Sequence, residues 1–292
     1  MSRNTITDRV ITALGPMAWG TTYLVTTELL PPGRPIFVAL CRALPIGLLI
    51  LLLTRQLPRG RWWWRAAVLG SLNIGMFFPL LFVAAYRLPG GVAATIGAVQ
   101  PLLVALLAWL VLGESLTRWR LLAAGFGLAG VALLVLKPEA SFDQLGVLAA
   151  LIATSFMALG TILGKRWGRP VALMSFTAWQ LVAGGILLLP IAFVLEGPPP
   201  TLTLTNLLGL LYLGVINTGM AYACWFFGMQ RLKATELSFL ALLSPFVAAC
   251  LGWIVLDQQF TPMQIIGIGL LLTGIVLGQQ GRSHDALATL NK

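Results

Sequence analysis

The segment LGSLNIGM at Leu69–Met76 returns as LGVINTGM at Leu213–Met220, 144 positions further along the chain. The likeness extends without a gap from Leu69–Val131 to Leu213–Ile275. Two Leu-rich helices that matched by chance would share Leu and Ala, so we interpret this likeness as an internal repeat. The identical pairs include Gly70/Gly214, Asn73/Asn217, Gly75/Gly219, Met76/Met220, Arg87/Arg231, Pro101/Pro245, Trp109/Trp253, Thr117/Thr261, Gly125/Gly269 and Gly130/Gly274.

The composition around this repeat is that of a membrane protein. Of the 292 residues, 58% are hydrophobic and 10% are charged, and the mean hydropathy is +0.91. Soluble domains contain about 25% charged residues, so a soluble fold is excluded. A spanning helix needs about 20 apolar residues, and roughly ten spans use nearly the whole chain.

Charge-free apolar stretches predict ten membrane-spanning helices, separated by breaks rich in Pro, Gly and charge. They cover residues 10–29, 35–54, 64–86, 91–112, 118–136, 142–164, 172–195, 205–228, 235–256 and 262–280.

The positions of the 19 Lys and Arg residues predict the orientation of these spans. Most of them lie on alternate loops, at Arg3, Arg9, Arg55, Arg59, Arg61, Arg65, Arg118, Arg120, Lys165, Arg166, Arg169, Arg231, Lys233, Arg282 and Lys292. By the positive-inside rule these loops and both termini are cytoplasmic, which requires an even number of spans.

Each repeat contains five spans, an odd number, so the second half enters the membrane from the opposite side to the first. We therefore predict an all-α membrane protein with two inverted five-helix repeats, residues 1–138 and 139–281, and a cytoplasmic tail at 282–292. Inverted repeats of this kind are typical of alternating-access transporters, whose substrate site lies near the midplane between the halves.

The net charge of +10 does not indicate a nucleic-acid partner, because the basic residues lie between apolar spans. Cys41, Cys224 and Cys250 fall in apolar stretches, and we assign them no metal or redox role. The N-terminus shows no signal peptide with a cleavage site, so the first span is expected to act as its own insertion signal. These features fit a multi-pass protein of a bacterial inner (plasma) membrane.

Short motifs occur along the chain: Trp19-Gly20, Arg42, Gln100-Pro101, Leu112-Gly113-Glu114, Gly125, Gly130, Lys165, Ser244-Pro245, Gly269 and Gly274. With the ten spans and the repeat, they resemble two EamA-type domains of the drug/metabolite transporter superfamily. The resemblance implies ten helices, both termini inside, and export or uptake of small metabolites such as amino acids. One departure is Glu114, whose repeat position holds Gln258, so a role for this acid is not shared by the two halves.

Polar side chains inside the spans are the candidates for substrate binding, because such groups are costly in hydrocarbon unless they face a cavity or a partner. Asn73 and Asn217 come first, since the repeat places them symmetrically on the third and eighth spans. Their amides would hydrogen-bond an amino or carboxylate group of a substrate. The alternative is hydrogen bonding between packed spans.

Gln100 and Ser244 precede prolines in the middle of the fourth and ninth spans. Pro101 and Pro245 each remove a backbone donor, which in the first case frees the carbonyl of Gly97 and kinks the helix. Such breaks line binding sites and act as hinges in many transporters, and a static kink is the alternative.

Several aromatic residues at similar depths would wall a cavity suited to apolar or aromatic substrates, or hold an ammonium by cation–π contact. They are Trp19, Tyr23, Phe77, Phe78, Trp179 and Tyr222. Contact with lipid, or packing between helices, is the alternative for each of them. The run Trp62-Trp63-Trp64 instead indicates an interfacial belt.

Arg42 lies about eight residues into the second span and corresponds, in a family-style alignment, to Gln180 on the seventh. It would pair with a substrate carboxylate. Backbone carbonyl partners, or snorkelling towards the outer face, are the alternatives. Lys165, near the cytoplasmic end of the sixth span, fits a plain positive-inside residue.

An intramembrane enzyme would need His, Asp or Glu at membrane depth, but the one His is His284, and Asp143, Glu196 and Asp257 flank the ends of spans. We therefore predict no catalytic residue, metal site or cofactor. Nothing resembles the selectivity filter of a channel. Proton coupling would need a titratable acid near the midplane. Glu28, the acid of the first span, lies near the external end of that span, which favours a facilitator or a weakly coupled exporter.

The expected partners are membrane lipids and a small-molecule substrate. Large neutral or aromatic amino acids are the first expectation for the substrate, from the resemblance and the aromatic supply. Cationic drugs and nucleotide-linked sugars are the alternatives. Glycines on the fifth and tenth spans indicate close helix packing. A chain that carries both halves is expected to be a monomer, and a dimer formed through these glycines is the alternative.

Overall fold

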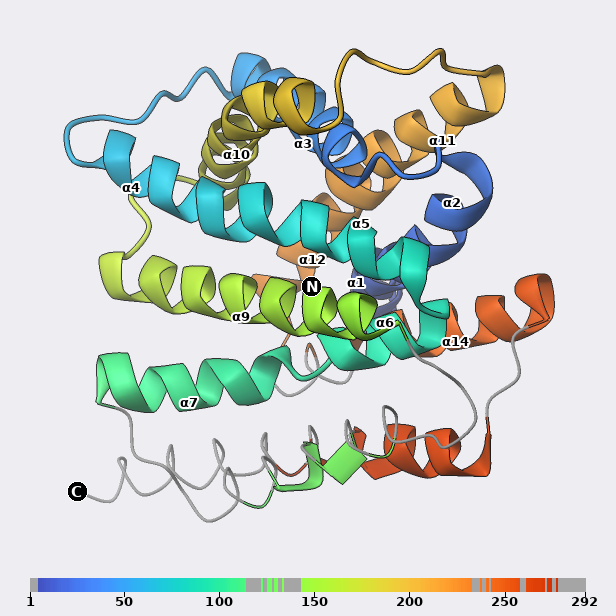
Figure 1. The fold of residues 1–292 in the computed structure, drawn as a ribbon. Coiled ribbons are helices and arrows are strands. Elements are labelled where there is room, and N and C mark those ends of the chain that lie inside the picture. Colours follow the sequence, from blue (N-terminus) through green and yellow to red (C-terminus); the bar gives the residue numbers. More distant parts are fainter. Residues whose placement is uncertain are drawn as a thin grey trace, which may run out of the picture.

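The computed structural model describes residues 5–113, 143–232, 243–257 and 261–270, together with residues 122, 125–127, 129, 130, 133, 237, 240, 241, 272–274 and 277. Regular structure in these residues is entirely helical (Figure 1). Most of the fifth predicted span (118–136), the whole predicted tail (282–292), Glu114 and Gln258 lie outside them.

The helices up to the ninth predicted span are, in chain order, α1 (Thr5–Gly20), α2 (Thr22–Leu29), α3 (Pro35–Thr54), α4 (Trp62–Gly70), η1 (Ser71–Met76), α5 (Phe77–Arg87), α6 (Gly90–Gly97), α7 (Gln100–Leu112), α9 (Gln144–Trp167), α10 (Leu173–Leu195), α11 (Leu204–Gly214), η2 (Val215–Met220), α12 (Ala221–Met229) and α14 (Leu243–Leu256). A further apolar helix covers Pro262–Gly274.

Six continuous helical stretches within the described ranges are long and apolar enough to cross a membrane: Pro35–Thr54, Trp62–Arg87, Gly90–Leu112, Gln144–Trp167, Leu173–Leu195 and Leu204–Met229. They match the predicted second, third, fourth, sixth, seventh and eighth spans. Many large apolar side chains on their surfaces are exposed, such as Leu53 at 75% and Val194 at 80%. Such a surface suits contact with lipid chains rather than water. The chain is an integral multi-pass membrane protein.

The fourth span is broken rather than kinked. α6 ends at Gly97 and α7 begins at Gln100. Pro101 has no N–H to donate to the carbonyl of Gly97, and the intervening turn tightens to an i→i+3 bond from Val99 N to Ile96 O at 3.1 Å. The sequence therefore predicted the position of the irregularity correctly, but the helix is interrupted there and not only bent.

The first span is also interrupted, at Thr21 between α1 and α2. Both the N–H and the hydroxyl of Thr21 donate to the carbonyl of Ala18, at 3.1 and 2.7 Å. A threonine hydroxyl that bonds a nearby carbonyl competes with the regular helical ladder. This break was not predicted.

The third and eighth spans each contain a π-helical segment, η1 and η2, at repeat-equivalent positions 144 residues apart. Asn73 and Asn217 are the third residues of the two segments. In a π-helix each N–H bonds to the carbonyl five residues back, which widens the turn, and such segments are frequent at functional sites. Nothing in the sequence pattern had indicated them.

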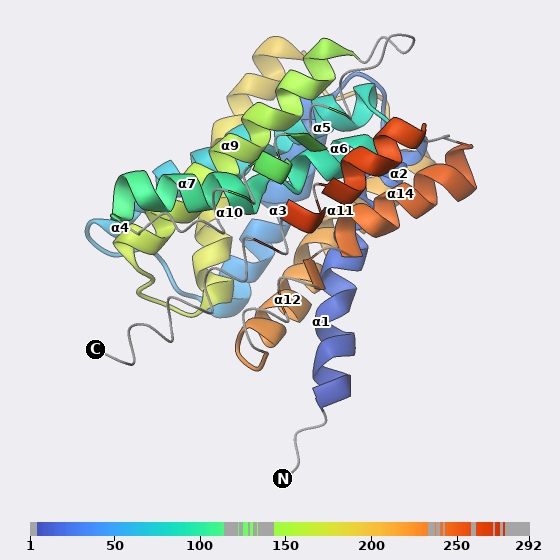
Figure 2. The same ribbon diagram turned by 90° about the horizontal axis from the view of Figure 1, so that it is seen from below.

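Many packed helix pairs join the two predicted halves, and the most extensive are α3 with α10, α1 with α12, and α5 with α9 (Figures 1 and 2). Glycines bring α3 and α10 together. A Cβ added at Gly47 would lie 2.7 Å from the Cβ of Leu181, and one added at Gly185 would lie 2.7 Å from the Cβ of Leu44. Larger side chains at either glycine would push the two helices apart.

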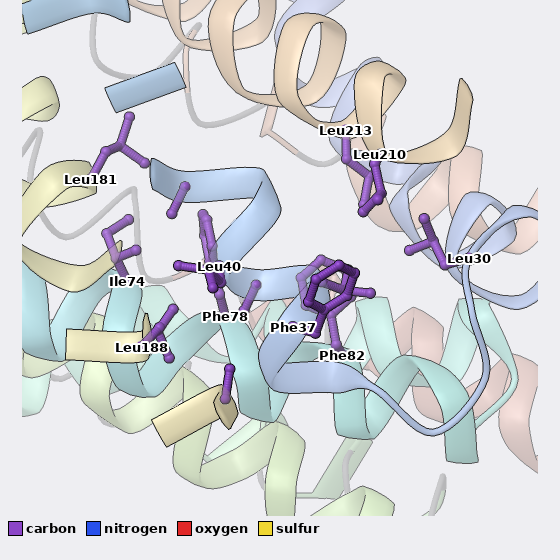
Figure 3. Packing of buried hydrophobic residues seen from close by; sticks show 14 of the residues in the cluster. Leu30, Phe37, Leu40, Ile74, Phe78, Phe82, Leu181, Leu188, Leu210 and Leu213 are labelled. Atoms are coloured by element: carbon purple, nitrogen blue, oxygen red, sulfur yellow. The ribbon is translucent and has the colours of Figure 1, made fainter. Parts of the chain in front are cut away.

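The main apolar core lies where α3, α5, α10 and α11 meet (Figure 3). Phe78 and Phe82 of α5 are almost fully buried there, and Figure 3 shows Phe78 near Leu40 and Phe82 near Phe37 of α3. A second cluster lies between α2, α5, α6, α9 and α14 and contains Tyr23. Both clusters therefore mix helices from the two predicted halves.

Ionic and capping contacts tie helix ends together on the side predicted to be external. The carboxylate of Glu196 accepts hydrogen bonds from Ile36 N at 2.7 Å and Phe37 N at 2.9 Å, which satisfies two free donors at the start of α3. Asp143 caps α9 and forms an ion pair with Arg87 at the end of α5. Hydrogen bonds from Arg87 and from the backbone of α9 hold the pKa of this carboxyl below its usual range.

Candidate functional site

A small cavity of about 70 Å³ lies between the second part of the first span, α5, the broken fourth span and α9. Its lining is mainly apolar, with polar groups from three side chains; it consists of Tyr23, Phe77, Leu81, Ala84, Ala93, Gly97, Gln100, Ala150, Ala153 and Thr154. Pockets that enclose drug-sized ligands measure about 300–1,000 Å³, so a substrate of that size would need the helices to separate.

The break in the fourth span borders this cavity. Gly97 and Gln100, on either side of the break, both contribute to the lining. The carbonyl of Gly97 receives no bond from Pro101, which has no N–H. Thr154 donates its hydroxyl hydrogen to Ala150 O at 2.7 Å, so its oxygen offers the cavity an acceptor. The site thus presents a few polar groups, among them the Thr154 oxygen as an acceptor, within an apolar surface.

Arg42 is buried beside this region, with 3% of its surface exposed. Its Nε donates to the hydroxyl of Thr218 at 3.1 Å, and its guanidinium lies over the ring of Phe78 at 4.5 Å and near that of Phe82 at 5.9 Å. Its Nη1 has no hydrogen-bond partner among the residues that the structure describes. The structure therefore places Arg42 against an aromatic face and a hydroxyl rather than against backbone carbonyls.

Asn217 joins η2 to the first span. Its side-chain Nδ2 donates to Thr22 Oγ1 at 2.8 Å, and its backbone carbonyl accepts a hydrogen bond from Trp19 Nε1 at 3.0 Å. The Trp19 ring packs edge-on against Tyr222, with centroids 5.5 Å apart. Asn217 is fully buried, and within the described ranges its Oδ1 has no hydrogen-bond partner.

Asn73 has a similar arrangement in η1. Its Nδ2 donates to Gln180 Oε1 of α10 at 2.6 Å, and Gln180 in turn donates to Phe176 O at 3.3 Å. Its Oδ1 is buried and has no hydrogen-bond partner in the part of the chain that the structure describes. The absence of a side chain at Gly160 of α9 makes room for this amide. Each repeated asparagine therefore bonds a neighbouring span through nitrogen and keeps a buried oxygen without a partner.

The predicted site residues fall into several separate groups. Tyr23, Phe77 and Gln100 line the cavity. Arg42 with Phe78, Asn73 with Gln180, and Asn217 with Trp19 form the pairs described above, and Tyr222 packs on Trp19.

Trp179 lies away from the cavity, in an aromatic cluster beside the connection between α3 and α4. Its indole N–H donates to Gln56 O at 2.6 Å, and its ring lies 6.3 Å from Trp62 and 6.4 Å from Phe176. Because Gln56 belongs to the Arg-rich loop predicted to be cytoplasmic, this cluster marks that end of α10. The contacts of Trp179 are those of an anchor at the helix end.

Ser244 and Pro245 lie in the first turn of α14, and neither belongs to the cavity lining. The backbone of Ser244 closely approaches Gly20, where an added Cβ would lie 2.6 Å from the Ser244 carbonyl oxygen. Pro101 stands in the first turn of α7, at the break.

Three threonines in contact with these groups were not singled out from the sequence: Thr22, Thr154 and Thr218. Threonine hydroxyls commonly bond helical carbonyls in apolar spans, so residue type alone gives no signal. Thr218 has Ile74 as its repeat counterpart, so the repeat did not mark it either. No cluster of His, Cys, Asp or Glu suited to a metal occurs among the residues that the structure describes.

Comparison with known proteins links this architecture to a family. A model of the EamA-like transporter family matches residues 10–136 and again residues 144–278. Protein PecM of Dickeya dadantii (strain 3937) is 44% identical over 266 residues, which cover 90% of this chain and 89% of PecM. The uncharacterized inner membrane transporter YedA of Escherichia coli (strain K12) is 27% identical over 90% of this chain and 88% of its own length.

More distant similarities agree with this match. A WAT1-related chloroplastic protein of Arabidopsis thaliana is 30% identical over 91% of this chain and 68% of its own length. A crystal structure of a protein that is 20% identical superposes with a TM-score of 0.62, over 93% of this chain and 96% of that one. At this identity the structural likeness shows a common fold.

Proposed function

The chain belongs to the EamA-like transporter family, and from that premise we propose that it moves small amphipathic metabolites, above all large neutral or aromatic amino acids, across the bacterial inner membrane. Proteins of this family are transporters and not enzymes. Transport would proceed by alternating access, with a substrate site near the midplane.

The proposed architecture has ten spans, in two inverted halves at residues 1–138 and 139–281, with both termini in the cytoplasm. The helix pairs support this symmetry. α1 and α9 open the two halves, and α5 and α12 end their third spans. Exchanging the halves therefore turns the pair α1–α12 into α9–α5, and the pair α3–α10 into itself. A two-fold axis that relates the halves produces this pattern, and the odd number of spans in each proposed half would place that axis in the membrane plane.

The observation that carries the proposed site is the pair of asparagines in matching π-helices. Asn73 and Asn217 occupy equivalent positions, and each presents a buried amide oxygen without a partner. Buried acceptors are normally paired, because a missing hydrogen bond costs about 1–3 kcal/mol. A substrate that donates hydrogen bonds, such as an ammonium group, would remove this cost, and the apolar cavity lining suits its side chain.

The first test is uptake of a panel of radiolabelled amino acids into liposomes that contain the purified protein, with and without a pH gradient. We expect saturable uptake of large neutral and aromatic amino acids that does not depend on the gradient. The double variant Asn73→Ala, Asn217→Ala is expected to lose this uptake, because both acceptors are removed.

The control is Gln144→Ala, which removes an amide from an exposed position at the start of α9. It should transport as the unmodified protein does. Full uptake by the double variant would contradict the assigned site, and no uptake of any amino acid would contradict the assigned substrate class. Cationic drugs are the next substrates to test in that case, although a buried guanidinium near the site repels a cation.

A further inference from the structure

Arg42 is a buried cation without a counter-ion in the described part of the chain. The carboxylates described there lie near helix ends, and none is classed as buried: Asp8, Glu28, Asp143, Glu196 and Asp257. None of these five forms an ion pair with Arg42, whereas Asp143 pairs with Arg87. A buried charge normally has a partner, since breaking a buried ion pair costs several kcal/mol.

The contacts that Arg42 does make satisfy its guanidinium only in part. Thr218 accepts one hydrogen bond from Nε, and the face of Phe78 lies 4.5 Å away. Nη1, with its two hydrogens, is buried and has no partner. An ionisable residue that remains in the membrane interior at this cost indicates a functional site.

The surroundings of Arg42 lead to the cavity. Phe78 follows Phe77, which lines the cavity, and Tyr23, another lining residue, lies near Arg42. With 3% of its surface exposed, Arg42 is out of reach of a lipid headgroup at the protein surface. An anion that meets Arg42 would therefore arrive through the space between the helices.

We propose that Arg42 is the anion subsite of the transporter, where Nη1 binds a carboxylate of the transported molecule while Thr218 holds Nε. This inference rests on the proposed transport function and narrows its substrate class to molecules with a carboxylate. Guanidinium binds carboxylates through short, charge-assisted hydrogen bonds in a fixed planar geometry. Asn217, next to Thr218 in the chain, offers a buried acceptor for an ammonium, so the set of free groups matches an amino acid.

The test measures binding of two small probes to the purified full-length protein by the shift in its melting midpoint. Phenylacetate carries a ring and a carboxylate, and phenylacetamide has the same ring with an uncharged amide. We expect phenylacetate to raise the midpoint and phenylacetamide to have much less effect. In Arg42→Gln, which places at this position the residue found at its counterpart Gln180, affinity for phenylacetate should fall roughly tenfold or more.

Arg42→Lys keeps the charge and serves as a second variant if the glutamine protein does not fold. It should bind phenylacetate more weakly than the unmodified protein does, because an ammonium lacks the planar fork. Arg59→Gln makes the same change as Arg42→Gln at an exposed loop position and should leave the shift unchanged. Any of three results would overturn the subsite: equal midpoint shifts with phenylacetate and phenylacetamide, no midpoint shift with phenylacetate, or an undiminished shift with phenylacetate in both Arg42 variants.

Transport separates this inference from the proposed function. If amino-acid amides are carried as well as amino acids, the transport function stands and the carboxylate subsite is wrong. If no amino acid is carried while phenylacetate still binds through Arg42, the subsite stands and the amino-acid assignment is wrong.

Discussion

Thr218 connects the buried cation to the irregular backbone of the eighth span. Its hydroxyl accepts a hydrogen bond from Arg42 and donates one at 3.0 Å to the carbonyl of Leu213, five residues earlier. One oxygen thus holds the guanidinium and also spans the wide turn of η2. Its repeat counterpart, Ile74, has no hydroxyl and packs closely on Gly184 instead. The two halves therefore share a backbone form but stabilise it differently.

Replacing Thr218→Val keeps the shape of the side chain and removes the hydroxyl. We expect the free energy of unfolding to fall by about 1–3 kcal/mol, since a buried charged donor is left without its acceptor. The melting midpoint of the purified protein measures this change.

Thr161→Val is the matched control, because Thr161 is exposed and its hydroxyl also bonds a helical carbonyl, at Met157. Its midpoint should change little, as is usual for surface substitutions. Equal midpoints for the two variants would show that the Arg42 contact contributes nothing to stability.

Among the elements, η1 and η2 show that the repeat extends beyond the spacing of apolar residues. Each begins immediately after a glycine, Gly70 or Gly214, and ends at a methionine. A π-helical segment holds one residue more than an α-helix of the same length. Because each segment contains one of the two repeated asparagines, the extra residue sets the direction in which its amide projects.

Deleting one residue from a π-helical segment should convert it to regular α-helix and leave the flanking helices in place. We expect deletion of Leu72, or of its counterpart Ile216, to give a protein with a nearly normal melting midpoint and to abolish most uptake, because the asparagine amide turns away from the site.

Deletion of Val83 in α5 is the comparison. There the rest of the span would rotate by about 100°, and the protein should fail to fold. Normal uptake after deletion of Leu72 and of Ile216 would refute a role for the π-helical segments.

For the whole molecule, contacts at opposite ends of the helices agree with the predicted membrane sides. Glu196 with the start of α3, and Asp143 with Arg87, lie at helix ends that the charge distribution assigns to the outside. Trp179 and Gln56 meet at the Arg-rich ends assigned to the cytoplasm. Loops assigned to one side are thus in contact with each other, as a common membrane plane requires.

Cysteine labelling tests the proposed orientation. In a variant without Cys41, Cys224 and Cys250, we expect Thr201→Cys to react with a membrane-impermeant thiol reagent in intact spheroplasts. Arg59→Cys should react only after the membrane is opened, because basic loops remain in the cytoplasm. The reverse pattern would invert the topology, and labelling of both from outside would contradict the proposed arrangement of spans.

The sequence by itself determined the membrane class, the position of most spans, the internal likeness of the two halves and the family. Within lipid every backbone polar group must be bonded internally, so a long apolar stretch has little choice but to form a helix. Pro101 likewise predicted an irregularity in the fourth span, because proline has no N–H to donate to the carbonyl of Gly97 in any fold.

Only the tertiary structure decided which buried polar groups meet. Spans such as α10 are apolar on all sides, so the sequence carries little information about how each helix is rotated or which neighbour it faces. The rotation of α10 brings Trp179 into contact with Gln56, while the adjacent Gln180 contacts Asn73. The rotation of α3 likewise brings Arg42 into contact with Thr218, 176 positions away in the chain. The π-helical turns were equally hidden, because a one-residue change in helical register depends on packing against other spans and leaves the apolar character of the stretch unaltered.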